Sequence, residues 1–150
     1  MPISEICNRE IIVVQLNDTA LEAARLMRQH HVGDVIVIVE DSGGVRVPVG
    51  IVTDRDLVGE IMAPELDQMV ITVGDIMAPG LATVKENTGV FEAIQYMRAK
   101  GVRRLPVVND GGGLVGILTL DDLLELLAEE LLALATLVRH EQKKETMSRR

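Results

Sequence analysis

The chain contains an internal repeat, and this repeat limits its possible folds more than any other feature of the sequence. When the sequence is shifted by about 70 positions, "VVQLNDTALEAARLMRQHHVGDVIVIV" falls on "TVKENTGVFEAIQYMRAKGVRRLPVVN". Identical residues then coincide along both stretches: Val14/Val84, Asn17/Asn87, Glu22/Glu92, Ala23/Ala93, Met27/Met97, Arg28/Arg98, Val32/Val102 and Val37/Val107. Because half-sized units are marginal on their own, the repeat predicts one domain built from two similar halves.

A second repeated element, "GIVTDRD" and "GILTLDD", follows the last predicted strand of each copy. The shift falls here to about 66 positions, because the first copy has the longer hairpin. The matching residues are Gly50/Gly116, Ile51/Ile117, Thr53/Thr119, Asp56/Asp122 and Leu57/Leu123. A strand does not need the Gly, Thr and Asp of this motif in order to pack. We therefore expect the motif to serve a site outside the core.

Each copy is predicted to form the element order β-α-β-β-α. Continuous apolar runs are typical of strands covered on both faces, and the turns "EDSGG" and "NDGGG" join such runs into hairpins. Thr19 and Glu22 predict a capping box at the start of the first helix. The predicted strands include residues 11–14, 35–39, 82–84 and 105–108, and the first helix of each copy covers residues 20–29 or 90–99.

The fold class predicted from this order is α/β (α+β). We expect two β-α-β-β-α repeats packed sheet to sheet with pseudo-twofold symmetry, followed by a C-terminal helix. The first repeat is assigned to residues 1–65, the second to residues 66–130, and a helical extension with a polar tail to residues 131–150. The last helix is expected from Asp121 to about His140. Its Leu-rich stripe has to be buried, which favours packing on another subunit over packing on its own domain.

Composition excludes several classes of function. With 15 Lys and Arg against 23 Asp and Glu, the net charge of −8 opposes binding to nucleic acid or to an anionic membrane. Aromatic residues make up 1% of the chain, too few for the stacking platforms that bind single-stranded nucleic acid. The single cysteine excludes an internal disulfide, and we recognise neither a signal peptide nor a transmembrane run. We therefore expect a soluble, cytoplasmic protein.

The sequence offers almost no catalytic machinery, and we predict that the chain is not an enzyme. We recognise no Ser/His/Asp set, no paired catalytic carboxylates and no Walker lysine. His30 and His31 are adjacent, so their side chains diverge rather than converge on a metal. No metal site is predicted.

The repeat resembles the tandem cystathionine-β-synthase (CBS) domain pair, or Bateman module, in a stand-alone form. The second copy, "DIMAPGLATVKENTGVFEAIQYMRAKGVRRLPVVNDGGGLVGILTLDDLLE", is similar to the family pattern throughout. The first copy is a looser match, with "VGDVIVIV" where "VRRLPVVN" would be expected. The resemblance implies a regulatory module with two clefts and no required cofactor. Its effector would be an adenosyl ligand such as AMP, ADP, ATP or S-adenosylmethionine.

The resemblance also implies which residues line the two clefts, because the acidic loop of one repeat faces the first two strands of the other. The favoured cleft would combine Ile51, Thr53, Arg55 and Asp56 with Ala82, Val102, Arg103 and Arg104. The second, weaker cleft would combine Ile117, Thr119 and Asp122 with Ile12, Val32, Gly33 and Asp34.

Elementary chemistry agrees with these roles. A carboxylate of each motif suits two ribose hydroxyls, and a threonine hydroxyl suits a phosphate oxygen. Arg103 and Arg104 favour a phosphate in the first cleft, whereas Asp34 and Asp121 oppose one in the second. Structural alternatives remain open: the arginines as a solvated corner with ion pairs, the threonines as helix caps, and the acids as first-turn residues placed by the helix dipole.

The expected output of such a module is a change of conformation or of dimer packing. We expect a homodimer whose ligand state is read by an unknown effector protein, because the two repeats fill most of the chain. The alternative is a structural dimerisation module that binds no nucleotide.

Overall fold

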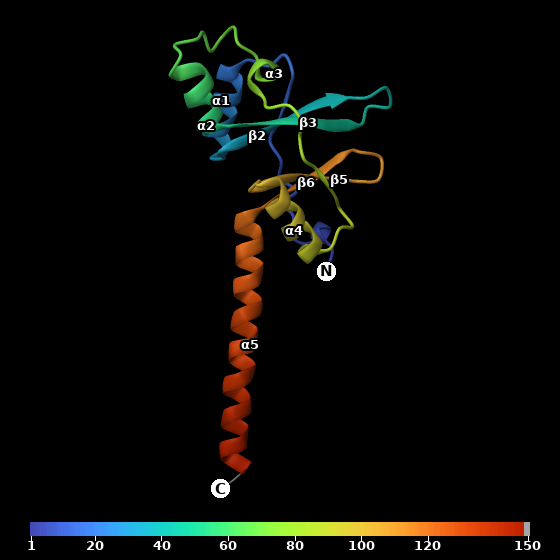
Figure 1. Cartoon of the computed structure of the whole chain (residues 1–150), viewed down its shortest axis with the longest axis vertical. Helices are drawn as coiled ribbons and strands as arrows, with labels where there is room; N and C mark the ends of the chain where they lie inside the picture. The colour runs from blue at the N-terminus through green and yellow to red at the C-terminus, as the bar shows by residue number, and fades with distance from the viewer. Residues whose placement is uncertain (149–150) are drawn as a thin grey trace.

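Within residues 1–148, which the computed structural model describes, each repeat forms one three-stranded sheet (Figure 1). The short element η1 is a 3-10 turn and η2 is a π-helical turn. In chain order the elements are η1 (Ile3–Glu5), β1 (Val13–Gln15), α1 (Ala20–His30), β2 (Asp34–Glu40), β3 (Arg46–Thr53), α2 (Asp54–Leu57), η2 (Val58–Met62), α3 (Val73–Ile76), β4 (Val84–Lys85), α4 (Val90–Lys100), β5 (Arg104–Val108), β6 (Leu114–Thr119) and α5 (Leu120–Ser148).

The two sheets have the same topology. The strand orders are β1-β2-β3 and β4-β5-β6, and in each sheet the first pair is parallel and the second antiparallel. The registers also correspond, since Gly50 lies opposite Val37 and Gly116 lies opposite Val107. The predicted β-α-β-β-α order and the mixed α/β class are therefore confirmed.

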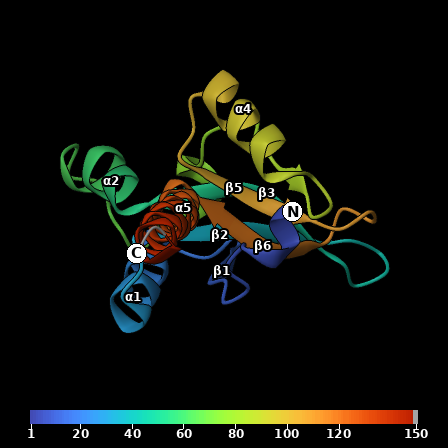
Figure 2. The same cartoon turned by 90° about the horizontal axis from the view of Figure 1, so that it is seen from below.

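The sheets pack on each other through branched aliphatic side chains. Ile36 and Ile38 of β2 form a buried cluster with Ile117 of β6. Because successive side chains of a strand point to opposite faces, Val35 and Val37 instead join a second cluster with residues of α1. Figure 2, which looks along α5, shows the strands of both halves in the middle with α1, α2 and α4 around them. The predicted sheet-to-sheet packing is confirmed.

The segments that precede the two repeats are exchanged between the halves. Ile3 of η1 is fully buried in the core of the second half, and its N–H donates to the Thr88 carbonyl oxygen at 2.8 Å. Val73 of α3 is fully buried in the core of the first half, and its N–H donates to the Asp18 carbonyl oxygen at 2.8 Å. Each half is therefore completed by the leading segment of the other repeat.

This exchange explains the glycine that begins each repeated acidic motif. A Cβ atom at Gly116 would lie 2.8 Å from Cys7 Sγ and 2.9 Å from the Asn8 carbonyl oxygen. A Cβ atom at Gly50 would lie 2.5 Å from Met77 Sδ. Real Cβ atoms do not approach other atoms so closely. Glycine is therefore needed where the exchanged segments cross the sheets.

Threonine capping boxes set the starts of several helices. The predicted box at α1 is confirmed, because Thr19 Oγ1 accepts from the Glu22 N–H at 3.2 Å and Glu22 Oε2 accepts from the Thr19 N–H at 3.0 Å. Thr72 and Asp75 form the same box at α3. Each box satisfies backbone N–H groups that a helix start leaves without partners.

Helix α5 is longer than predicted. It continues to Ser148, whereas the sequence indicated an end near His140. The residues after His140 are mostly Glu, Gln and Lys, which are good helix formers, and none of them is Pro or Gly. Every residue from Ala128 to Ser148 is exposed, and the helix projects away from the sheets (Figure 1).

Candidate ligand-binding site

The two repeated acidic motifs form equivalent turns from a strand into a helix. At the end of β3, Thr53 Oγ1 accepts from the Asp56 N–H at 3.2 Å, and Asp56 Oδ2 accepts from the Thr53 N–H at 2.9 Å. Arg55, between them, is exposed. At the end of β6, the corresponding distances between Thr119 and Asp122 are 3.1 Å and 3.2 Å. Each threonine therefore caps a helix, and each aspartate uses one carboxylate oxygen to hold the turn.

A cavity of about 240 Å³ opens beside Thr119. Ile12, Val32 and Ile117 give it aliphatic walls, and Gly33 and Thr119 also line it. These are residues of the second predicted cleft, which the structure thus brings together. Asp34, another predicted member, lines the cavity as well. Asp122, the last member of that cleft, is hydrogen-bonded to Thr119 at the same turn but does not itself line the cavity.

Charged side chains of both signs line this cavity. Three carboxylates, from Glu10, Asp34 and Asp121, are accompanied by the guanidinium groups of Arg103 and Arg104. The two arginines were predicted for the other cleft, together with Thr53 and Asp56. The structure places them at the cavity beside Thr119.

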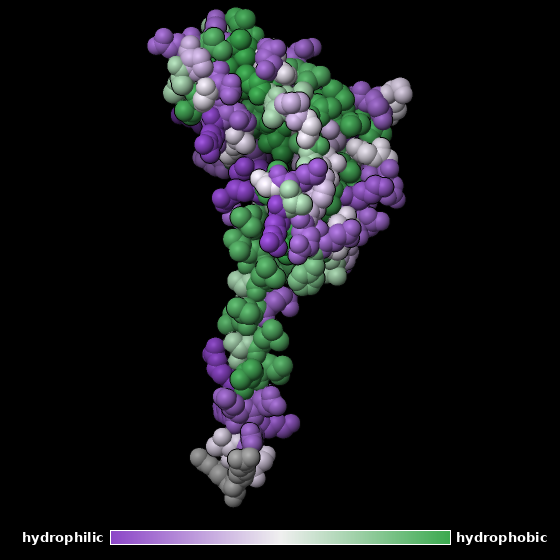
Figure 3. Space-filling view, in the orientation of Figure 1, coloured by the Kyte–Doolittle hydropathy of each residue, from purple (hydrophilic) through white to green (hydrophobic). Residues whose placement is uncertain are grey.

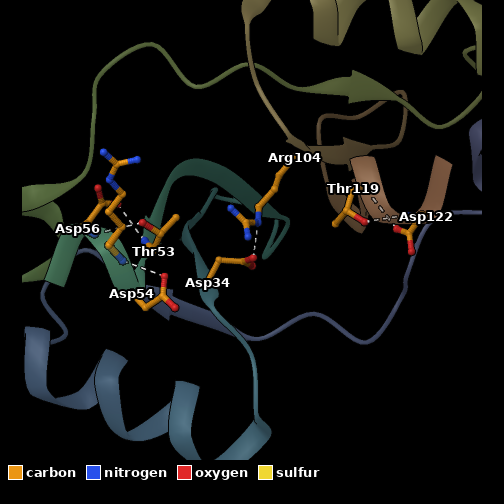
Figure 4. A network of polar contacts seen from close by, with 8 residues as sticks. Asp34, Thr53, Asp54, Asp56, Arg104, Thr119 and Asp122 are labelled. Atoms are coloured by element: carbon orange, nitrogen blue, oxygen red, sulfur yellow. Dashed lines mark hydrogen bonds and ion pairs between the residues drawn. The ribbon is translucent and has the colours of Figure 1, made fainter. Parts of the chain in front are cut away.

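Arg104 is not a free cation, because its Nε atom lies 2.6 Å from Asp34 Oδ2. In Figure 4 this ion pair lies between the turn of Thr53 and the turn of Thr119. The side chains of Arg104 and Asp34 are 37% and 21% exposed, so the pair is only partly shielded from water. One of the two arginines, Arg104, thus forms an ion pair. This agrees with the structural alternative in which Arg103 and Arg104 form a solvated corner with ion pairs.

Of the other residues predicted for the favoured cleft, Thr53, Arg55 and Asp56 lie at the turn that ends β3. Thr53 and Asp56 are half-buried there. Ile51 packs against the cluster between the sheets, whereas Ala82 and Val102 pack against the core of the second half. A ligand cleft shared by these residues stays a prediction.

Sequence reasoning missed one side of the cavity. Asn8, Glu10 and Ile11 line it from the segment that joins the exchanged leading turn to β1. Asn8 is held there by two backbone hydrogen bonds with Ile117, each of 2.9 Å. The only sequence signal was their position, with Asn8 and Glu10 just before the predicted strand at residues 11–14 and Ile11 at its first residue. The exchange itself leaves no local pattern in the sequence.

Cys7, which contacts the sheet next to Asn8, is a structural residue. Burial raises the pKa of its thiol, while the nearby Arg9 guanidinium acts in the opposite direction. The thiol is therefore protonated near neutral pH and is a poor nucleophile. Within residues 1–148, no group of three or more His, Cys, Asp or Glu is arranged to hold a metal ion. In the same range, no helix is both long enough and apolar enough to cross a membrane.

The family model of the CBS domain matches this chain twice, at residues 3–63 and 73–129. The two matches coincide with the two β-α-β-β-α repeats. The chain belongs to the CBS domain family and contains two CBS domains.

Several relatives align with most of the length of this chain. Uncharacterized protein MK0525 of Methanopyrus kandleri is 37% identical over 124 residues, which are 83% of this chain and 61% of that protein. CBS domain-containing protein YhcV of Bacillus subtilis is 36% identical over 114 residues, 76% of each chain. Hypoxic response protein 1 of Mycobacterium tuberculosis is 32% identical over 125 residues, 83% of this chain and 84% of that one. The chain thus spans less than two thirds of the M. kandleri relative.

Solved structures of CBS proteins have the same fold. Hypoxic Response Protein I, crystallised with two coordinated zinc ions, has a TM-score of 0.71 at 30% identity, over 83% of this chain and 98% of its own. The CBS domain pair of protein MJ0100, in complex with 5′-methylthioadenosine and S-adenosyl-L-methionine, has a TM-score of 0.70 at 25% identity, over 85% and 99%. A hexameric CBS-CP12 protein from bloom-forming cyanobacteria has a TM-score of 0.70 at 27% identity, over 83% and 69%.

Proposed function

We propose that this chain is a regulatory module that binds an adenosyl ligand and signals its ligand state to a partner protein. The observation that carries the proposal is the cavity beside Thr119, where aliphatic walls meet a threonine–aspartate turn. The CBS pair of MJ0100, which shares the fold, was crystallised with two ligands that both contain an adenosyl group. In our proposal the module works in the cytoplasm as a homodimer.

The cavity suits the parts of an adenosyl group. Ile12, Val32 and Ile117 offer an aliphatic surface to the adenine ring. This surface takes the place of aromatic stacking, because aromatic residues make up only 1% of the chain. At about 240 Å³ the cavity is somewhat smaller than the roughly 300 to 1,000 Å³ common for small-molecule sites, so it suits one nucleoside-sized group. In our proposal Asp122, which holds its turn with one carboxylate oxygen, accepts from a ribose hydroxyl with the other.

The charges around this cavity favour a neutral or cationic adenosyl ligand over a nucleotide phosphate. Three carboxylates stand against two guanidinium groups, and one of the latter, on Arg104, is already paired with Asp34. A phosphate beside Asp121 would meet a repulsion on the order of 1 kcal/mol. We therefore propose that this cavity takes S-adenosylmethionine or a related thioether nucleoside.

For AMP, ADP or ATP we propose the turn formed by Thr53 and Asp56. Arg55, which is exposed at this turn, supplies the cation for a phosphate in this proposal. Arg104 contributes less than the sequence indicated, because Asp34 already neutralises it.

A thermal-shift titration of the wild-type chain and two single variants tests the proposal. The probes are S-adenosylmethionine, 5′-methylthioadenosine, AMP and ATP. At a hundredfold excess over Kd, a ligand adds about 2.7 kcal/mol of stability, or roughly 5 to 10 °C in Tm. We expect Asp122→Ala to abolish the response to the first two probes, and Asp56→Ala to leave it intact.

Two outcomes would contradict this assignment. Equal loss in Asp56→Ala and Asp122→Ala would remove the distinction between the two turns. A flat response of the wild-type chain to all four probes would favour a structural dimerisation module that binds no nucleotide.

A further inference from the structure

Helix α5 carries an apolar stripe that no other part of residues 1–148 covers. Its exposed fractions run from 41% at Leu127 to 70% at Leu131. Figure 3 shows apolar side chains along the projecting part of α5 and hydrophilic ones over its last turns. An apolar stripe of this length on a helix marks an interaction surface. We name it the Leu seam, and it consists of Leu124, Leu127, Leu131, Leu134 and Val138.

The charges of α5 are divided between its two ends. Residues 120–134 contain five acidic side chains and no basic one: Asp121, Asp122, Glu125, Glu129 and Glu130. Residues 135–148 contain three basic side chains against two acidic ones: Arg139, Lys143 and Lys144 against Glu141 and Glu145. Two such helices running in the same direction would place their acidic halves together. In opposite directions, each acidic half meets a basic half.

We propose that α5 binds the α5 helix of a second copy of this chain as an antiparallel pair through the Leu seam. This inference is independent of the proposed ligand. The seam has alternating spacings of three and four residues, which is the pattern of paired helices. An antiparallel pair is also isologous, so it closes after two copies.

The apolar layers and the charges select the same register. When Leu131 of one copy faces Leu134 of the other, Leu127 faces Val138, which gives four consecutive apolar layers. Ala128 and Ala135, which directly follow seam residues, are small enough to let the two backbones approach.

In this register the charged ends also correspond. Lys143 and Lys144 of one copy stand level with Asp122 and Asp121 of the other. The four apolar layers between Leu127 and Val138 and the long-range charge pattern thus agree on one arrangement, in which Leu124 lies outside these layers, level with Glu141 of the other copy.

Disulfide trapping between two full-length single-cysteine chains tests the direction of the pair. Both chains carry Cys7→Ala, and one then carries Leu127→Cys while the other carries Val138→Cys. In the antiparallel register these positions face each other across one layer, within reach of a disulfide. Two copies of the same variant would hold their cysteines about 16 Å apart along the pair, too far to bond.

We expect the mixed disulfide to form when the two chains are combined under mild oxidation, and at least tenfold less disulfide from either chain alone. Adding Leu131→Asp to both chains should abolish the mixed disulfide. Adding Thr136→Asp instead, on the opposite face of the helix, should leave it unchanged, and circular dichroism checks that both variants stay helical. Disulfides within each variant alone would show a parallel pair and overturn the proposal. An absence of disulfides in every mixture would assign the seam to another occupant and would overturn it equally.

Discussion

Asp34 and Arg104 occupy equivalent positions in the two repeats and form an ion pair, with Arg104 Nε 2.6 Å from Asp34 Oδ2. Asp34 is the strand partner of Thr53, and Arg104 is the strand partner of Thr119. The pair therefore connects the two acidic turns of the molecule (Figure 4). A ligand that displaces Arg104 beside the Thr119 turn therefore also affects Asp34, which lies beside the Thr53 turn.

We predict that this ion pair contributes little to stability. Its side chains are 37% and 21% exposed, and such pairs contribute about 0.2 to 1 kcal/mol. Denaturant unfolding of Asp34→Asn, Arg104→Gln and the double variant gives the coupling energy, and the double variant serves as the control. A coupling above about 3 kcal/mol would show a shielded pair instead.

The carboxylate of Asp121 is predicted to select ligands by charge. Asp121→Asn should raise the affinity of the cavity beside Thr119 for AMP about fivefold, because it removes a repulsion on the order of 1 kcal/mol. The affinity for 5′-methylthioadenosine, which has no phosphate, should not change. Calorimetric titration measures both, and Asp110→Asn, an exposed acid outside the cavity, is the control. An equal gain for both ligands would contradict an electrostatic cause.

The fold could be predicted because its determinants are local and occur twice. Apolar runs, glycine-rich turns and the Thr19 capping box each indicate one element, and the repeat indicates how the elements pair. The walls of the cavity, Ile12, Val32 and Ile117, followed from the resemblance to CBS pairs.

Two features of the site could not be predicted because they depend on contacts between distant segments. The exchanged leading turn brings Asn8 and Glu10 to the cavity, and only the three-dimensional path shows this. The partner of Arg104 is Asp34, which lies 70 positions away in the other repeat. Arg104, which the sequence predicted to be a phosphate-binding cation, is thus neutralised by Asp34 in the fold.

Because of the close contact at Gly116, we predict that any side chain at this position lowers the stability of the protein. Gly116→Ala should destabilise the protein by about 1 to 3 kcal/mol, because the new Cβ meets Cys7 Sγ and the backbone oxygen of Asn8. Gly59→Ala is the matched control, since no atom outside the adjoining residues and the backbone of its own helical turn lies within 4 Å of its Cβ position, and alanine favours a helix. Urea unfolding of both variants checks this. A neutral Gly116→Ala would show that the crossing segment yields easily.

The exchange of leading segments predicts a remote effect of Ile3. Ile3→Ala should cost about 2 to 5 kcal/mol, because it empties a fully buried position. The lost protection should appear in β5 and β6, whereas Val73→Ala should affect β2 and β3. Amide hydrogen exchange separates the two. A loss of protection in the first half after Ile3→Ala would instead show that the leading segments are not exchanged between the halves in solution.

We predict that the α3 capping box, through Asp75, makes a contribution to stability that is lost in acid. Hydrogen bonds from the backbone and then the side chain of Thr72 hold the pKa of the Asp75 carboxyl below its ordinary value. The folded state therefore favours the ionised form. This stability is present above about pH 4 and is lost as the pH falls through the lowered pKa.

Asp75→Asn should thus lower Tm at pH 7 and should match the wild-type chain in strong acid. Thermal unfolding from pH 7 to pH 2.5 measures the difference, with Asp110→Asn as the control for the loss of one charge. A Tm difference that stayed constant over this range would exclude a titrating contribution from Asp75.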